Sequence, residues 1–216
     1  DEVENFKIYG NDRYVYQYIS EKYPEDHIQF DIKKIRLVTI DIEVAAESGF
    51  PDVFNVAEEL LLITIQDYNT KFITTFGSRP YKTNPNRKNY RYVDCHSEEG
   101  LLTTFVDWWQ RHTPEVITGW NCEMYDIPYL MGRIERLMGE KYAKRMSPWG
   151  ICRRNEITIH GRQNIVYDIA GISVIDYLDL YKKSPATPNQ ESFKLDHIAM
   201  MELGQKKLDH SEYDTF

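Results

Sequence analysis

The sequence predicts an α/β fold: a mixed sheet flanked by helices, with an inserted β-hairpin. Strand-like and helical segments alternate from about residue 35 onward, which is typical of a sheet covered by helices. Segments 60–68 and 71–77 are both strand-like and meet at Asn69 and Thr70, so we expect an antiparallel hairpin that makes the sheet mixed. A second hairpin is expected within 152–169, turning at residues 160–162.

The individual elements follow from local patterns. Segment 35–44 is apolar on both faces, which is typical of a strand in the middle of a sheet. Ser97 is expected to cap a helix that runs to about residue 112, and Gly139 to end a helix over 127–138. Short strands are expected at 90–95 and 115–120, a strand continuing into a helix at 172–183, and a last helix before Gly204. The buried stripes of the two long helices are expected to be Leu101, Leu102, Phe105, Trp108 and Trp109 in one, and Leu130, Ile134, Leu137 and Met138 in the other.

Composition narrows the class of protein. The 216 residues carry a net charge of −8, so binding of nucleic acid through bulk electrostatics is not expected unless cations mask an acidic site. No apolar stretch approaches the length of a membrane span, and no membrane partner is expected. The three cysteines are not paired in sequence, which indicates free thiols rather than a zinc site or a disulfide framework.

Two carboxylates at the end of the central strand are the first candidate site. Side chains alternate along a strand, so Asp41 and Glu43 point to the same side. Two carboxylates at such a short distance repel each other unless a cation lies between them. Their hard oxygen ligands suit Mg²⁺ or Mn²⁺. For this short pattern alone, a solvated strand end is the simpler interpretation.

A second candidate lies in "NCEMYD" at residues 121–126. A strand ends before Asn121, and Asp126 opens a helix. A capping aspartate and a turn-forming asparagine would explain each residue separately. Together with Asp41 and Glu43, however, Asp126 would place three carboxylates on one rim of the sheet. Three such groups can hold two divalent ions about 4 Å apart, as in phosphodiester hydrolysis.

The two motifs, in order and with their flanking residues, resemble one known family. "DIE" at 41–43 is similar to the first exonuclease motif of family B DNA polymerases, and "NCEMYD" to their second motif, N-x-x-x-[FY]-D. "SVIDYLDLYKK" and "SFKLDHIAMMELGQKKL" resemble the segments that follow in the polymerases of T-even-type bacteriophages. The resemblance covers about residues 6–208. It implies a ribonuclease H-like fold and a proofreading 3′→5′ exonuclease that acts on the single-stranded 3′ primer end and releases nucleoside monophosphates.

The resemblance also implies roles for individual residues. Asp41, Glu43 and Asp126 would hold two Mg²⁺ or Mn²⁺ ions, and Glu43 would orient the attacking water. Asn121 and Tyr125 would contact DNA, with Asn121 at the terminal nucleotide. Phe50 would stack on the frayed primer end, although a surface hydrophobe is as good an interpretation. Lys207 would stand near the scissile phosphate, with Lys206 one residue away as the alternative. In the 152–169 hairpin, Arg162 would contact DNA phosphates, together with Arg153, Arg154 and His160, although arginines are also ordinary on an exposed hairpin.

Asp168, Asp176 and Asp179 are expected to have structural or capping roles instead. The family's third motif, Y-x-x-x-D, does not occur before Phe216, so we expect a fragment that is itself a weak or inactive nuclease. A chain that starts at Asp1 rather than at a methionine favours a fragment as well. Residues 1–30, with strand-like pieces such as "RYVYQYI", are expected to be the tail of the polymerase N-terminal domain, and 31–216 the exonuclease domain.

Three functional hypotheses follow. The first is the exonuclease domain of a replicative polymerase, with the polymerase domain in cis or as a separate subunit, in the cytoplasm of an infected bacterial host. The second is a non-catalytic ribonuclease H-like scaffold or single-strand-binding module of a split polymerase. The third, a ribonuclease H-like nuclease that acts on RNA, is disfavoured by the residues around Asn121 and Tyr177.

Overall fold

The structure, a computed structural model, describes residues 14–24, 30–46, 49, 51–83, 85–159, 161–185 and 190–206. The chain divides into two compact units, Asp1–Ile32 and Lys33–Phe216. Among the described residues, all buried apolar side chains lie between Val38 and Ile198, so the second unit contains the hydrophobic core. None of the helices in these described ranges is long and apolar enough to cross a bilayer.

The described part of the first unit contains one helix, α1 (Tyr14–Lys22). The strand-like interpretation of this segment is therefore wrong. Its tyrosine, valine and isoleucine favour strands, but such propensities span only about 1 kcal/mol and depend on context. A side-chain hydrogen bond from Gln17 to Glu21, four residues apart, and Lys22 in the last turn both stabilise the helix.

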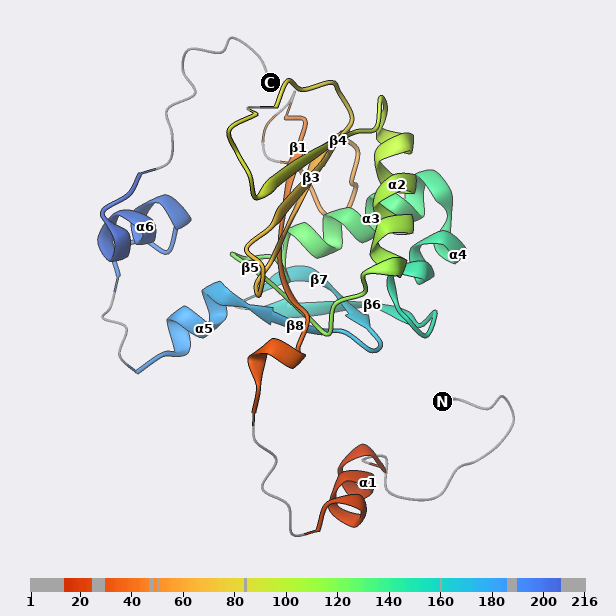
Figure 1. Cartoon of the computed structure of the whole chain (residues 1–216), viewed down its shortest axis with the longest axis vertical. Helices are drawn as coiled ribbons and strands as arrows, with labels where there is room; N and C mark the ends of the chain where they lie inside the picture. Colours follow the sequence, from red (N-terminus) through yellow and green to blue (C-terminus); the bar gives the residue numbers. More distant parts are fainter. Residues whose placement is uncertain are drawn as a thin grey trace. The chain divides into compact units, whose positions relative to one another are not determined.

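A six-stranded mixed sheet forms the centre of the second unit (Figure 1). The strand order is β4-β3-β2-β1-β5-β8. The strands are β1 (Leu37–Val44), β2 (Leu60–Asp67), β3 (Ile73–Gly77), β4 (Tyr90–Asp94), β5 (Val116–Gly119) and β8 (Ser173–Asp176). Pairs β1–β2 and β2–β3 are antiparallel, whereas β3–β4, β1–β5 and β5–β8 are parallel. The predicted mixed sheet and the interior position of β1 are confirmed.

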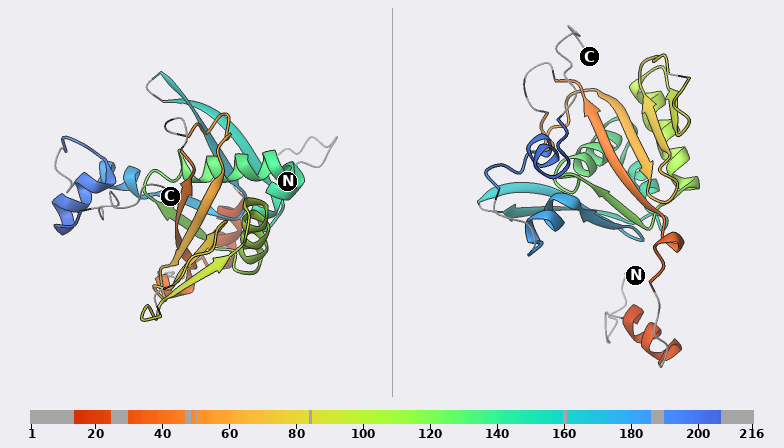
Figure 2. Two further views of the ribbon diagram at one scale, coloured as in Figure 1. Left: turned by 90° about the horizontal axis from the view of Figure 1, so that it is seen from above. Right: turned by 60° about the vertical axis from the view of Figure 1, so that its left-hand side comes forward.

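Helices cover the sheet (Figure 1). They are α2 (Glu98–Arg111), α3 (Asp126–Met138), α4 (Glu140–Ala143), α5 (Tyr177–Lys183) and α6 (Leu195–Leu203), with short 3₁₀ turns η1 (Ile32–Lys34) and η2 (Lys144–Met146). Figure 1 shows α2, α3 and α4 on one side of the sheet, and Figure 2 shows α5 and α6 (blue) extending away from it. Helix α2 packs against β2 and β3, and α3 against β1. The core therefore lies between the sheet and these two helices.

Local signals explain where the two long helices begin and end. The Ser97 side chain accepts a hydrogen bond from the Gly100 amide, as expected for the cap of α2. Gly139 ends α3 with φ 87°, a conformation that favours glycine. Leu137 is 46% exposed, so its assignment to the buried stripe of α3 is wrong. At about 100° per residue, Leu137 lies only about 20° around the helix from Leu130, so it is on the buried side; it is exposed because it stands in the last turn of α3, beyond the last buried residue of the helix, Ile134.

The inserted hairpin is a separate two-stranded sheet, β6 (Cys152–Ile159) and β7 (Arg162–Ile169). Its strands pair from Cys152 with Ile169 to Ile159 with Arg162, and Gly161 in the turn has φ 76°. Ile165, Tyr167 and Ile169 of β7 are buried, whereas β6 is largely exposed. The hairpin is thus anchored through β7, which packs against α3.

Candidate active site

The two acidic residues of β1 lie opposite its buried side chains. Val38, Ile40 and Ile42 are buried. Asp41 and Glu43, which alternate with them along the strand, are exposed. Strand β2 pairs with β1 along its whole length, but β5 pairs only with residues 37–39. The second half of β1 therefore has an edge that no strand covers on the β5 side, and Asp41 and Glu43 lie in this half.

Asp126 fills that uncovered edge. The backbone N–H of Ile42 donates a hydrogen bond of 3.0 Å to Oδ1 of Asp126, and the Asp126 side chain is buried, with 5% exposed. Asp126 is not the N-cap of α3, because Tyr125 holds that position without a side-chain hydrogen bond. The capping explanation of Asp126 is therefore wrong. Its carboxylate binds the amide of Ile42, which lies between Asp41 and Glu43 in the sequence. This hydrogen bond connects the two acidic motifs.

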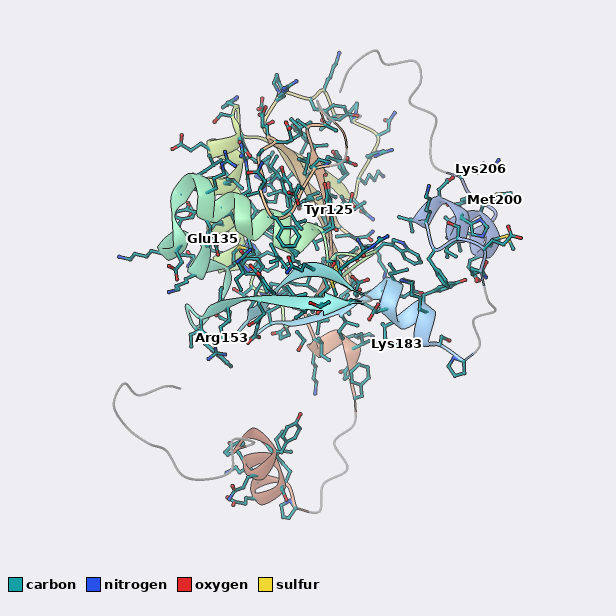
Figure 3. The ribbon with its side chains drawn as sticks, turned by 180° about the vertical axis from the view of Figure 1, so that it is seen from behind. Tyr125, Glu135, Arg153, Lys183, Met200 and Lys206 are labelled. Carbon is teal, nitrogen blue, oxygen red and sulfur yellow. The ribbon has the colours of Figure 1, made fainter. Side chains whose placement is uncertain are left out.

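The charges of these acidic groups influence one another's pKa. Burial, followed by the negative charge of Asp41, raises the pKa of Asp126 to about 7, although the hydrogen bond from Ile42 opposes the shift. Burial also raises the pKa of Tyr125 to about 12, with contributions from the neighbouring Tyr129, Asp126 and Glu43. Asp41, Glu43, Tyr125 and Asp126 thus form one electrostatically coupled group, which we call the acidic edge. Figure 3 labels Tyr125 at the beginning of α3.

A tight turn connects β5 to the acidic edge. Asn121 has φ 64°, the left-handed region that is uncommon for residues other than glycine. The carbonyl of Asn121 accepts hydrogen bonds from the amides of Met124 and Tyr125. A Cβ at Gly119 would come within 2.8 Å of both the Ile40 carbonyl oxygen and Cys122 Cβ. Gly119 therefore allows the turn to approach β1 closely, a role that the sequence analysis missed and that a glycine at a strand end could have signalled.

Asp168 in the hairpin, and Asp176 and Asp179 after it, have structural contacts, as the sequence predicted. Asp176 caps α5 by accepting a hydrogen bond from the Leu178 amide, and Asp179 pairs with Lys183 at 3.0 Å. Asp168 lies 3.4 Å from Arg153. Asp176 also accepts hydrogen bonds from the amides of Asn121 and Glu123, contacts that the sequence analysis did not predict.

The remaining candidates are not all within the described residues. Arg162 is exposed beside the hairpin turn, whereas Arg153 and Arg154 form ion pairs with Asp168 and Glu156. Phe50, His160 and Lys207 lie outside the described ranges, so their expected roles stay predictions. Lys206, the alternative to Lys207, is exposed, and Figure 3 labels it after α6. The structure thus brings together Asp41, Glu43, Asn121, Tyr125 and Asp126.

A metal ion would suit the acidic edge. Within the described ranges, no three histidine, cysteine or acidic side chains already converge as a ready-made metal site. The donor chemistry nevertheless fits a hard divalent cation, because carboxylate oxygens are suitable ligands and a cation would offset both the burial of Asp126 and the negative charge of Asp41, which together raise the pKa of Asp126. The residues that would hold it are Asp41, Glu43 and Asp126.

Comparisons with known proteins agree with this geometry. Residues 7–198 match the model of the family described as DNA polymerase family B, exonuclease domain. The DNA-directed DNA polymerase of Escherichia phage RB69 is 32% identical over 223 residues, covering 92% of this chain and 24% of that protein. The DNA-directed DNA polymerase of Enterobacteria phage T4 is 32% identical over 215 residues, covering 88% of this chain and 24% of that protein. The DNA polymerase catalytic subunit of Elephantid herpesvirus 1 is 26% identical over 188 residues. The chain spans about a quarter of the length of the two phage relatives.

Proposed function

The chain belongs to the exonuclease-domain family of family B DNA polymerases, and on this basis we propose that it is a proofreading 3′→5′ exonuclease domain of a replicative polymerase. The proposal includes the parent polymerase activity, single-stranded DNA as substrate, and action in the cytoplasm of an infected bacterium. The observation that carries it is the hydrogen bond from Ile42 to Asp126. This bond joins a strand-end acidic pair to a carboxylate more than 80 residues later in the chain.

Each residue of the acidic edge has a part in the proposed reaction. Asp41, Glu43 and Asp126 bind divalent cations, Mg²⁺ or Mn²⁺, two in the complete site. When bound, such ions supply Lewis acidity and lower the pKa of a bound water. Glu43 accepts a hydrogen bond from the attacking water and orients it. Burial and the charge of Asp41 raise the pKa of Asp126 to about 7, and a bound cation would lower it by favouring the ionised carboxylate.

DNA contacts come from residues around the acidic edge. Asn121 and Tyr125 contact the 3′-terminal nucleotide; the Tyr125 hydroxyl is protonated at neutral pH, as in any tyrosine, and burial raises its pKa further. Arg162 contacts the phosphate backbone from the hairpin turn. Phe50 stacks on the terminal base, and Lys207 stabilises charge at the scissile phosphate.

The test is hydrolysis of 5′-labelled single-stranded DNA with Mg²⁺ or Mn²⁺, by this chain and by the product of its whole reading frame. We expect shortening from the 3′ end and release of nucleoside monophosphates, with the shorter chain the weaker enzyme. The double variant Asp41→Ala, Glu43→Ala should lose activity by about 100-fold or more. Substitution of a residue that only supports a metal ligand already lowers metal affinity or activity by about 10–100-fold. DNA binding should largely remain.

The matched control is Glu140→Gln, an exposed carboxylate on α4 that pairs with Lys144 and should leave hydrolysis unchanged. Complete activity in the double variant of the whole product would refute the proposal. If neither the unchanged whole product nor its variants degrade DNA, yet all bind it, the non-catalytic single-strand-binding module is the better account. An RNA oligonucleotide in parallel distinguishes the RNA-acting hypothesis.

A further inference from the structure

Asp176 makes more contacts than a helix cap requires. Its side chain is 6% exposed. Oδ1 accepts hydrogen bonds from the amide of Leu178 at 2.9 Å, which is the cap of α5, and from the amide of Asn121 at 3.0 Å. Oδ2 accepts a hydrogen bond of 3.0 Å from the amide of Glu123. Two of the three bonds therefore hold the turn that follows β5 rather than the helix that Asp176 begins.

The turn needs such support. Asn121 has φ 64°, and a residue other than glycine keeps this conformation only where the surrounding structure stabilises it. Asp176 binds the amides at both ends of the segment 121–123. The carbonyls of the same segment begin α3, since Cys122 accepts a hydrogen bond of 2.9 Å from Ile127. Asp176 thus fixes the backbone from which the Asn121 side chain projects.

A second contact joins the same two parts of the chain. The Trp120 ring packs near those of Tyr177 and Tyr181, with centroid distances of 6.1 and 5.8 Å. Its indole Nε1 donates a hydrogen bond of 3.2 Å to the Phe193 carbonyl. The end of β5 and the beginning of α5 therefore form one packed unit, so the Asp176 carboxylate has little freedom to move away from the turn.

We infer that Asp176 is a positioning residue for DNA binding: it holds Asn121 in the orientation that meets the 3′-terminal nucleotide. The inference rests on the proposed function, in which Asn121 contacts that nucleotide. A carboxylate suits the task because it offers two acceptor oxygens to two backbone donors, and bonds to an ionised acceptor are the stronger kind. An asparagine would keep one acceptor and turn an N–H₂ group toward the other amide.

Two substitutions separate positioning from capping. Asp176→Asn has the same shape but loses one of the acceptor oxygens. Asp176→Ser keeps a good cap for α5, because serine is a favoured N-cap residue, but is too short to reach both amides of the turn. Asp179→Asn is the matched control, since Asp179 lies in the first turn of the same helix and pairs with Lys183.

The measurements are fluorescence anisotropy of labelled single-stranded DNA with Ca²⁺ in place of Mg²⁺, amide hydrogen exchange, and circular dichroism. In Asp176→Asn and Asp176→Ser we expect about tenfold weaker DNA binding and faster exchange at the amides of Asn121 and Glu123. Mn²⁺ affinity should stay within about twofold, because Asp126 is held independently by Ile42. All three variants should keep the helical spectrum of the unchanged chain.

Three outcomes would overturn the inference. DNA binding by Asp176→Ser at the level of the unchanged chain would reduce Asp176 to a cap of α5. Equal weakening by Asp179→Asn would point to a general effect of negative charge near α5. If the unchanged chain does not bind DNA, the proposed function and this inference both fail. If the unchanged chain and its Asp176 variants all bind DNA normally, only this inference fails.

Discussion

Asp126 places a carboxyl group in surroundings that oppose its ionised form. Burial and the charge of Asp41 oppose its ionisation, whereas hydrogen bonds from the amide of Ile42 and from its own backbone amide favour it. Such a carboxyl group is costly for the metal-free fold at high pH, and a cation would remove the cost. The free energy of unfolding should therefore depend, through this one side chain, on both pH and bound metal.

The pH dependence has a definite sign. The pKa of Asp126 is raised from 3.8 to about 7, so between these values the folded chain holds a proton that the unfolded chain has lost. The stability that this proton contributes is complete below the unfolded pKa and is lost as pH rises through about 7. We therefore expect Asp126→Asn, in EDTA, to raise the free energy of unfolding by about 2 kcal/mol near pH 8 and by much less near pH 4.

Urea denaturation at the two pH values, with Glu140→Gln as control, measures this difference. The same stabilisation at both values, or none at either, would contradict the raised pKa. Addition of Mn²⁺ near pH 8 should then stabilise the unchanged chain and leave Asp126→Asn nearly unaffected.

At the scale of elements, α3 holds the connection between β1 and β2. Arg133 is 7% exposed and pairs with Glu98 of α2, and its Nη1 donates to the carbonyls of Val56 and Ala57 at 2.9 and 3.0 Å. Glu98 also accepts a hydrogen bond of 2.8 Å from the Leu60 amide. The helix that carries Asp126 is therefore fixed to the segment that follows Asp41 and Glu43.

Arg133→Met should break this arrangement. Removing one partner of a buried ion pair leaves the other charge unpaired, so we expect a loss of about 3 kcal/mol in the free energy of unfolding. Arg136→Met is the matched control: Arg136 is exposed, donates to the Asn55 carbonyl, and should cost less than about 1 kcal/mol. Urea denaturation of both variants decides the matter, and equal losses would show that the ion pair contributes nothing of its own.

The hairpin of β6 and β7 gives a second element-scale prediction. Arg162 lies exposed beside the turn, whereas Arg153 is 3.4 Å from Asp168. If Arg162 contacts a DNA phosphate, Arg162→Ala should weaken single-strand binding severalfold and reduce the slope of log affinity against log salt by about 0.7, the value for one contact to a single strand. Arg111→Ala, at an exposed arginine in the last turn of α2, is the control. An unchanged salt slope in Arg162→Ala would place Arg162 away from the DNA.

At the scale of the whole molecule, the two units differ in what stabilises them. The buried apolar residues in the described part of the chain all belong to the second unit, and they include the largest fully buried side chains, Trp109 and Tyr129. Residues 31–216 should therefore fold without the first 30 residues. We expect the melting temperature of a 31–216 chain, followed by circular dichroism, to stay within about 3 °C of that of the whole chain. A larger loss would show that residues 1–30 stabilise the second unit.

Most of the fold could be predicted because its signals are local. The apolar run at 35–44, the Asn69-Thr70 turn, the Ser97 cap and Gly139 each act over a few residues, and the structure has the corresponding elements. The helix at 14–22 was missed because residues with strand propensity formed it. Leu137 was misplaced because a periodic pattern does not show where a core ends.

The sequence by itself determined the α/β class, the mixed sheet, the hairpin and the two acidic motifs, since these depend on residue type and short spacing. Only the tertiary structure decided what Asp126 and Asp176 do. Each looks like a helix cap along the chain, but Asp126 binds the amide of Ile42 and Asp176 binds the turn at Asn121. The reason is physical: a carboxylate binds whichever donors the fold leaves without a partner. Those donors appear only where β5 ends beside β1 and where β8 ends beside the turn.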